Sequence, residues 1–179
     1  MERLLVLLGI CALVHTQYLN NSSEQENDSK LFFERIRVHA DQHFMKAFTH
    51  IHEDRKHFDV FVQLDRKLGS NYLIMNIKTR VKREGSNDFI KTFDLRHMDF
   101  CSFLNNPDLR HFFMTTIHFN KALECPVQVG NYSVKNIGVL NIINEHSMRK
   151  GTYKFFAEIA EVTSDIPKIF ALQVITIVM

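Results

Sequence analysis

The ten histidines are the residues of this chain best suited to catalysis or metal binding. Zinc proteases place two His residues at positions i and i+4 of one helix, so that both imidazoles reach the same metal. Here His52 and His57 are five residues apart, which predicts side chains that point to different sides of a strand end and turn. Two other pairs have a compatible spacing but lack an identifiable third ligand or general base: His50 with His52, and His39 with His43. We therefore expect solvated surface histidines and no metal site.

No other catalytic or cofactor motif stands out in the sequence. It contains no Gly-x-Ser-x-Gly elbow, no phosphate-binding loop and no dinucleotide fingerprint. The 22 Lys and Arg residues nearly balance the 20 Asp and Glu residues, and the net charge of +2 gives no electrostatic reason to bind nucleic acid or an anionic membrane. We expect a protein that is not an enzyme, uses no cofactor and binds no nucleic acid.

The three cysteines must be interpreted together with the start of the chain. Leu4–Val14 is an uninterrupted apolar run, shorter than the roughly 20 residues that span a bilayer and typical of a secretory signal peptide, here residues 1–16. A membrane anchor or a buried strand is the alternative for this run. Removal of the signal takes away Cys11, and in an oxidising compartment the remaining Cys101 and Cys125 should form one disulfide. A zinc site would need more ligands at short spacing. The sequence thus predicts a secreted, extracellular protein without stable membrane insertion.

Four Asn-x-Ser sequons follow the predicted signal, and a glycan at any of them must face water. Three lie in the polar residues 20–30, which contain almost no apolar side chains, so we expect residues 17–30 to be a flexible lead-in. Residues 31–179 then form a single domain, because no linker or repeat divides them. The candidate glycosylation sites are Asn20, Asn21, Asn27 and Asn131.

Alternating apolar and polar residues predict that most of the chain forms strands. Residues 57–64 and 73–81 both alternate, and the short turn-like segment 65–70 between them favours an antiparallel hairpin. Further strands are predicted at residues 36–39, 44–52, 89–95, 132–143, 152–162 and 169–179. About eight short strands favour a mainly β, two-sheet sandwich over an α/β nucleotide-binding enzyme.

One segment has helical periodicity instead. Asn106 suits a helix cap and Pro107 the first helical position. The apolar residues that follow recur on one helical face: Leu109, Phe112, Phe113 and Ile117, with Thr116 among them. This short helix would lie inside the loop that the Cys101–Cys125 disulfide closes.

The order of several short motifs resembles a known family. Tyr72, Lys78-Thr79-Arg80-Val81 and Cys101-x-Phe103-Leu104 precede an apolar helix, followed by Glu124-Cys125-Pro126, Gly130-Asn131-Tyr132 and Tyr153-Lys154-Phe155. This pattern, over about residues 58–162, is similar to an insect family of small secreted proteins carrying a domain of unknown function related to the ML lipid-recognition fold, with the chemosensory CheB proteins among its relatives. The resemblance implies an immunoglobulin-like two-sheet sandwich whose sheets splay apart to hold a lipid or hydrocarbon.

The last predicted strand has apolar residues on both faces, and Phe155 and Phe156 must face opposite ways on theirs. Such apolar surfaces must be buried by the tethered helix, by a partner chain or by a ligand. A second interpretation of residues 169–179 is a removable signal for a lipid anchor. We expect a secreted binding protein for a lipid, fatty-acid derivative or hydrocarbon, with a role in chemosensation and a cell-surface receptor as a further partner. The alternative is an extracellular protein–protein interaction module without a ligand. The predicted lining residues are Met75, Phe112, Phe113, Ile117, Tyr132, Phe155 and Ile159.

Overall fold

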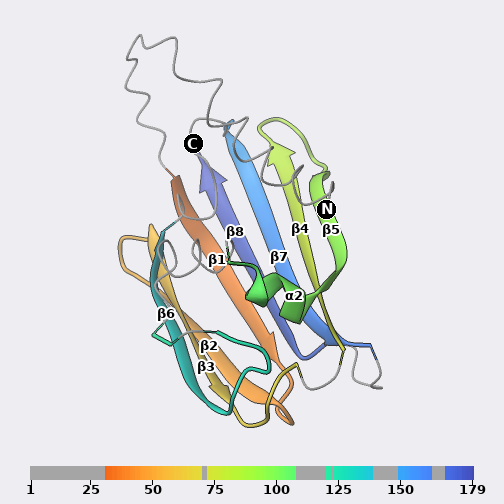
Figure 1. The fold of residues 1–179 in the computed structure, drawn as a ribbon. Coiled ribbons are helices and arrows are strands. Elements are labelled where there is room, and N and C mark those ends of the chain that lie inside the picture. The colour runs from red at the N-terminus through yellow and green to blue at the C-terminus, as the bar shows by residue number, and fades with distance from the viewer. Residues whose placement is uncertain (1–30, 70–71, 108–119, 122, 139–148, 163–167) are drawn as a thin grey trace.

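The computed structural model describes residues 31–69, 72–107, 120–121, 123–138, 149–162 and 168–179. Eight strands and one short helix are described within these ranges (Figure 1). The predicted signal peptide and polar lead-in lie outside the described residues, and both stay predictions. Among the described residues, no helix combines the length and apolar character needed to cross a membrane.

The strands form two antiparallel sheets. The five-stranded sheet has the order β1-β8-β7-β4-β5, and its members are β1 (Leu31–Ala40), β4 (Leu73–Arg83), β5 (Ile90–Asp99), β7 (Gly151–Glu161) and β8 (Phe170–Val178). The three-stranded sheet has the order β2-β3-β6, with β2 (Met45–Ile51), β3 (His57–Leu64) and β6 (Gly130–Gly138). The prediction of a mainly β protein with two sheets is confirmed.

Side-chain alternation explains why the two sheets face each other. In β3, Phe58, Val60 and Leu64 are buried, and they alternate with more exposed residues on the other face. Two clusters join the sheets: one brings Met45 and Leu64 against Met75, and the other brings Phe33 against Phe58. Because alternate residues of a strand point to opposite faces, this pattern buries one face of each sheet in a shared core.

The predicted hairpin between residues 57–64 and 73–81 is wrong. Strand β3 pairs with β2 and β6, whereas β4 pairs with β5 and β7, so the connection crosses from one sheet to the other. Leu68 in this connection forms an isolated antiparallel bridge with Val127, with both backbone N–H groups donating to the partner's carbonyl. A short link between alternating runs is therefore compatible with a crossover as well as with a hairpin.

Strand β8 lies between β1 and β7, inside the five-stranded sheet. Its inner residues Val174 and Thr176 are buried, while Ile175 and Ile177 on the outer face are half-buried. Ile175 pairs with Arg35 on one side and Lys154 on the other, and the aliphatic stems of such side chains can cover an apolar neighbour. A strand built into the sheet in this way is not expected of a removable anchor signal.

The short helix α2 (Phe100–Asn105) follows β5 directly and ends where the sequence predicts a helix to begin, so it is an element that the sequence analysis did not predict. The Asp99 carboxylate caps its first turn by accepting a hydrogen bond from the backbone N–H of Ser102 at 2.6 Å. Phe100 and Leu104 are buried, so the helix presents one apolar face to the core. It lies against the five-stranded sheet, on the side where the narrower three-stranded sheet packs (Figure 1). The helix predicted after Asn106 lies outside the described residues.

Candidate ligand-binding cavity

A cavity of about 440 Å³ lies between the two sheets. Residues from both sheets and from α2 form its described wall, and 22 of the 24 lining residues have side chains without a hydroxyl, amide or charged group. Tyr132 and Ser133 are the two exceptions. The described wall contains no His, Cys, Asp, Glu, Lys or Arg, and the hydroxyl groups of Tyr132 and Ser133 are its only polar side-chain groups.

The three-stranded sheet supplies one wall of the cavity. Val60 pairs with Val134 and Val62 pairs with Tyr132 across β3 and β6, which places these four side chains on one face. Phe58 and Ile137 lie one step further along the same two strands. The even-numbered residues of β3 all line the cavity because the side chains of a strand alternate with a period of two.

The five-stranded sheet supplies the opposite wall through β4, β7 and β8. Ile77, Ala157 and Leu172 form one cross-strand row, and Phe155 with Val174 lies in the next row. Ala157 has the smallest side chain of this wall. A small residue at the centre of an otherwise bulky layer leaves volume that its neighbours do not fill, which is a local reason for a cavity here.

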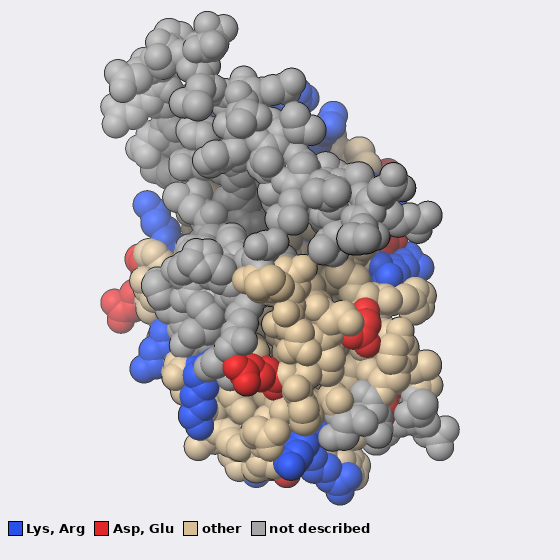
Figure 2. Space-filling view, viewed as in Figure 1, with Lys and Arg blue, Asp and Glu red and all other residues tan. Residues whose placement is uncertain are grey.

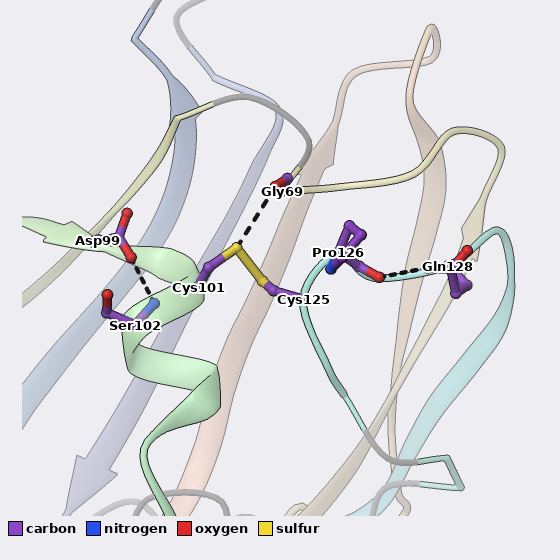
Figure 3. The surroundings of a disulfide bond; sticks show 7 residues. All are labelled: Gly69, Asp99, Cys101, Ser102, Cys125, Pro126 and Gln128. Atoms are coloured by element: carbon purple, nitrogen blue, oxygen red, sulfur yellow. Dashed lines mark hydrogen bonds between the residues drawn. A yellow bond between two sulfur atoms is a disulfide. The ribbon is translucent and has the colours of Figure 1, made fainter.

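The disulfide lies at the end of the sandwich that holds α2 (Figure 3). Cys101 in the first turn of α2 bonds to Cys125, with 5.4 Å between their Cα atoms, as the sequence predicts. Gly69, on the link between the sheets, passes directly beside this bond with a φ of +91°. A Cβ added at Gly69 would stand 2.6 Å from Cys101 Sγ and 3.1 Å from Cys125 Sγ. The bond therefore ties α2, the crossover link and the segment before β6 into one unit.

Apolar side chains around this unit continue the cavity wall. Phe100, Phe103 and Leu104 of α2 line the cavity, together with Leu68, Leu123 and Val127. The Asp99 residue that caps α2 is half-buried, and hydrogen bonds from the side chain and the backbone N–H of Ser102 lower the pKa of its carboxyl group. An ionised Asp99 is the form that caps the helix, so α2 keeps this cap at neutral pH.

Some polar atoms of the cavity wall already form hydrogen bonds within the protein. The Tyr132 hydroxyl donates to the backbone carbonyl of Gln128 at 2.6 Å. The backbone N–H of Ser133 donates to Asn120 Oδ1 at 2.8 Å. A guest molecule would therefore meet mainly methyl, methylene and aromatic groups along the described wall, which favours an apolar guest.

Four of the seven predicted lining residues lie on this wall: Met75, Tyr132, Phe155 and Ile159. Phe112, Phe113 and Ile117 lie outside the described residues. The prediction omitted much of the three-stranded wall, including Val60, Val62 and Val134. Their strand alternation was visible in the sequence, but alternation identifies an inward face and cannot tell a cavity from a filled core. Binding of a ligand by any of these residues stays a prediction.

Asn131 is the one candidate glycosylation site that falls within the described residues. It lies on β6, opposite Gln63 of β3, and its side chain is exposed. Asn20, Asn21 and Asn27 lie outside the described residues. Exposure at Asn131 meets the structural requirement for a glycan, and its modification stays a prediction.

The histidine cluster lies at the β2–β3 turn, away from the cavity. The rings of His52 and His57 are 6.1 Å apart, so the prediction that they point to different sides is wrong: the tight turn brings them together. His52 Nε2 lies 2.9 Å from Asp59 Oδ1, and His57 Nδ1 lies 2.6 Å from Asp54 Oδ2. Each histidine thus has its own carboxylate, and the described residues contain no group of three or more ligands that could hold a metal.

These contacts lower the pKa of both carboxyl groups. For Asp54, the main cause is the hydrogen bond with the His57 ring. For Asp59, burial alone would raise the pKa, but hydrogen bonds from the Asn136 backbone N–H and the His52 ring outweigh it. The cluster is best explained as a set of turn-stabilising hydrogen bonds.

Residues 75–155 match a family described as "Protein of unknown function (DUF1091)". The matched segment begins on β4 and ends on β7, and it includes both disulfide cysteines, α2 and all of β6. A comparison with curated proteins gave no match. The relationship to a family of unknown function that the sequence predicts is thus confirmed at this level.

Proposed function

We propose that this protein is a secreted carrier with an ML-like, immunoglobulin-like sandwich fold, which binds a lipid, fatty-acid derivative or hydrocarbon between its sheets. The observation that carries the proposal is the cavity of about 440 Å³ with an almost wholly apolar wall. This volume lies within the range of about 300–1,000 Å³ typical of small-molecule sites. An empty apolar space of this size is costly to a fold, and an apolar guest would remove that cost.

Affinity in such a site comes from removing the guest's methylene groups from water. Each buried CH₂ contributes about 0.8 kcal/mol, which corresponds to about a fourfold tighter Kd for each added carbon. Few hydrogen bonds are available on the described wall, so the site should discriminate by length and bulk more than by functional group. We expect affinity to rise along a series of saturated fatty acids until the chain outgrows the cavity.

Secretion is supported by the Cys101–Cys125 disulfide, because such bonds persist in oxidising compartments. A role in chemosensation follows from the resemblance to the insect secreted family and is part of the same proposal. In that role the carrier would deliver an apolar signal molecule through an aqueous secretion to a receptor at a cell surface.

The proposal can be tested by filling the cavity from within. Ala157→Phe places a ring at the centre of the five-stranded wall, whereas Ala171→Phe places the same ring on the outer face of that sheet. Both variants and the parent protein would be secreted from cultured cells, examined by native mass spectrometry and titrated with a fluorescent fatty acid. Ala157→Phe should lower the affinity for the fatty acid at least tenfold, because the new ring would occupy volume that several CH₂ groups of the fatty acid need.

Ala171→Phe should bind the fatty acid like the parent protein. Co-purified lipid in the parent and in Ala171→Phe, but not in Ala157→Phe, would support the carrier. A parent protein that leaves the cell without lipid and takes up no fatty acid would contradict it and favour the ligand-free interaction module.

A further inference from the structure

A row of basic side chains crosses the outer face of the five-stranded sheet, opposite to the cavity. The strand register places five residues in line, one on each strand: Arg35 on β1, Ile175 on β8, Lys154 on β7, Arg80 on β4 and Lys91 on β5. Each is the direct cross-strand partner of the next. Four of the five are cations, although the net charge of the whole chain is only +2.

Two carboxylates on this face are already engaged beside the row. Glu158 lies 3.6 Å from Lys78 Nζ and 3.7 Å from Lys168 Nζ. Asp94 forms close ion pairs with Lys91 and Arg96, which together lower its pKa strongly. These pairs neutralise one end of the row and leave its centre unneutralised.

The rest of the row, from Arg35 on β1 to Arg80 on β4, has no ion-paired carboxylate among the described residues. Within the described residues, Arg35, Lys154 and Arg80 form no ion pair, and Lys154 instead holds its ammonium 3.7 Å above the ring of Phe89. Arg35 and Arg80 are exposed, and Lys154 is half-buried. Like charges directly opposite one another destabilise an antiparallel pair, so Lys154 beside Arg80 costs stability that an anionic partner would recover.

We propose that this row, Arg35, Lys154, Arg80 and Lys91, is a binding site for a linear sulfated polysaccharide. Neighbouring strands are about 4.8 Å apart, so the row spans about 19 Å across the sheet. Three cations at one-strand spacing, Lys154, Arg80 and Lys91, with Arg35 two strands beyond Lys154, suit an extended polyanion that runs across the strands. The guanidinium groups of Arg80 and Arg35 can hold sulfate groups through paired N–H donors. Lys82 and Arg37, next to the row on β4 and β1, widen it.

The apolar residues of this face argue against a membrane as the partner. Docking on a bilayer requires protruding apolar side chains that enter it. Ile175 and Ile177 on this face are half-buried. The large apolar side chains that do protrude lie elsewhere, the most exposed being Phe48 on β2 with 61% of its surface accessible.

The disulfide and the distribution of charge favour a sulfated sugar among polyanions. The disulfide indicates an oxidising, extracellular setting, where nucleic acid is scarce and sulfated polysaccharides are the common polyanions. On the side of the molecule seen in Figure 2, basic and acidic side chains of the described residues are interspersed and form no comparable row. The basic row is thus a local feature, which the small net charge conceals.

The experiment compares two double variants with the same change in net charge. Arg80→Gln with Lys154→Gln removes the centre of the row, and Lys46→Gln with Lys135→Gln removes two exposed cations of the three-stranded sheet. The full-length secreted protein would be eluted from immobilised heparin with a salt gradient, and its affinity for soluble heparin would be measured. The row variant should elute at lower salt and bind about tenfold or more weakly. The matched control should behave like the parent.

Equal retention of both double variants, or a parent protein that does not bind heparin at all, would overturn the proposal. Stronger binding of the parent to vesicles of anionic phospholipid than to heparin would also overturn it, in favour of a membrane partner. The proposal does not depend on the carrier function. Fatty-acid uptake should be the same in the parent and both variants, so a failed sugar site and a failed lipid cavity give separate results.

Discussion

The two ends of the sandwich are closed in different ways. At one end, Phe33 and Phe58 meet edge to face with ring centroids 4.9 Å apart, and both side chains are almost completely buried. At the other end, the Cys101–Cys125 disulfide, α2 and the Leu68–Val127 bridge connect the sheets, and Phe103 and Leu123 beside them are only partly buried. The cavity lies between these two ends and borders both clusters.

This difference distinguishes two ways of holding the sheets together, side-chain packing and a covalent bond. Direct contact between large side chains fixes the distance between the sheets, because close-packed atoms resist both compression and separation. A covalent bond limits how far segments move apart without filling the space between them. The sheets can therefore be in contact at the aromatic end and remain apart at the middle, where the cavity is found.

The largest effect is expected from breaking the packed end. Phe33→Ala should lower the free energy of unfolding by about 3–5 kcal/mol, because it removes a fully buried ring and leaves a cavity behind. Its neighbour Phe32 points to the outer face, where Arg55 lies over its ring, and Phe32→Ala should cost only about 1 kcal/mol. Urea unfolding of both variants checks the prediction. Equal losses would show that the aromatic contact does not hold this end.

The next effect concerns the tethered end. Cys101→Ser with Cys125→Ser should destabilise the protein by about 3 kcal/mol, since the bond closes a loop with a sequence separation of 24 residues. Affinity for a fatty acid should fall as well, because α2 would no longer be held against the cavity. Thermal unfolding with and without a reductant measures the first effect, and the reductant should not change the variant. If neither the double substitution nor the reductant lowered the melting temperature, the disulfide would not be what stabilises this end.

A smaller loss is expected when the disulfide is kept but its neighbour is changed. Gly69→Ala should cost about 2 kcal/mol, because the new Cβ would collide with Cys101 Sγ and the φ of +91° is unfavourable for Ala. Gly85 also has a positive φ, but no described residue lies within 4 Å of the Cβ that a substitution would add, so Gly85→Ala should cost about 1 kcal/mol, from strain alone. Chemical denaturation of the two variants separates collision from backbone strain. If Gly85→Ala were the worse of the two, the collision would be excluded as the main cause.

The smallest predicted effect is a gain in stability from a substitution at the packed end. Thr176 is fully buried, and its hydroxyl has no hydrogen-bond partner among the residues that the structure describes. Thr176→Val keeps the shape and removes the unpaired polar atom, so it should stabilise the protein by about 1 kcal/mol. Thr152, half-buried on the outer face of β7, provides the control: Thr152→Val should change stability by less than about 0.5 kcal/mol. A destabilised Thr176→Val would mean that a buried water molecule serves the hydroxyl.

The strands could be predicted because their inner residues alternate with polar ones, as Phe58, Val60 and Leu64 do. The pairing of those strands could not, because the short link at residues 65–70 suits both a hairpin and a crossover. The Asp99 cap of α2 was a visible signal, but six residues are too few for helical periodicity to show. The disulfide could be predicted because only two cysteines remain after removal of the predicted signal peptide.

The cavity and the basic row depend on distances that a sequence does not contain. Met75, Tyr132, Phe155 and Ile159 were identified as inward and apolar, yet whether the sheets close over them depends on fractions of a side-chain length. Likewise Arg35, Lys154 and Arg80 are far apart along the chain, and only the strand register brings them into line. A balanced composition therefore says little about local charge.

Strand β6 is an edge of the three-stranded sheet, and Asn131 lies exposed near its start. The backbone groups of an edge strand can pair with an incoming strand, which is a common route to aggregation. Here Asn120 already engages the backbone of Ser133 and the Asn131 carbonyl on this edge. A bulky sugar on Asn131 would stand in the way of such an incoming strand. Protein made without a glycan at Asn131 should therefore aggregate more readily on storage.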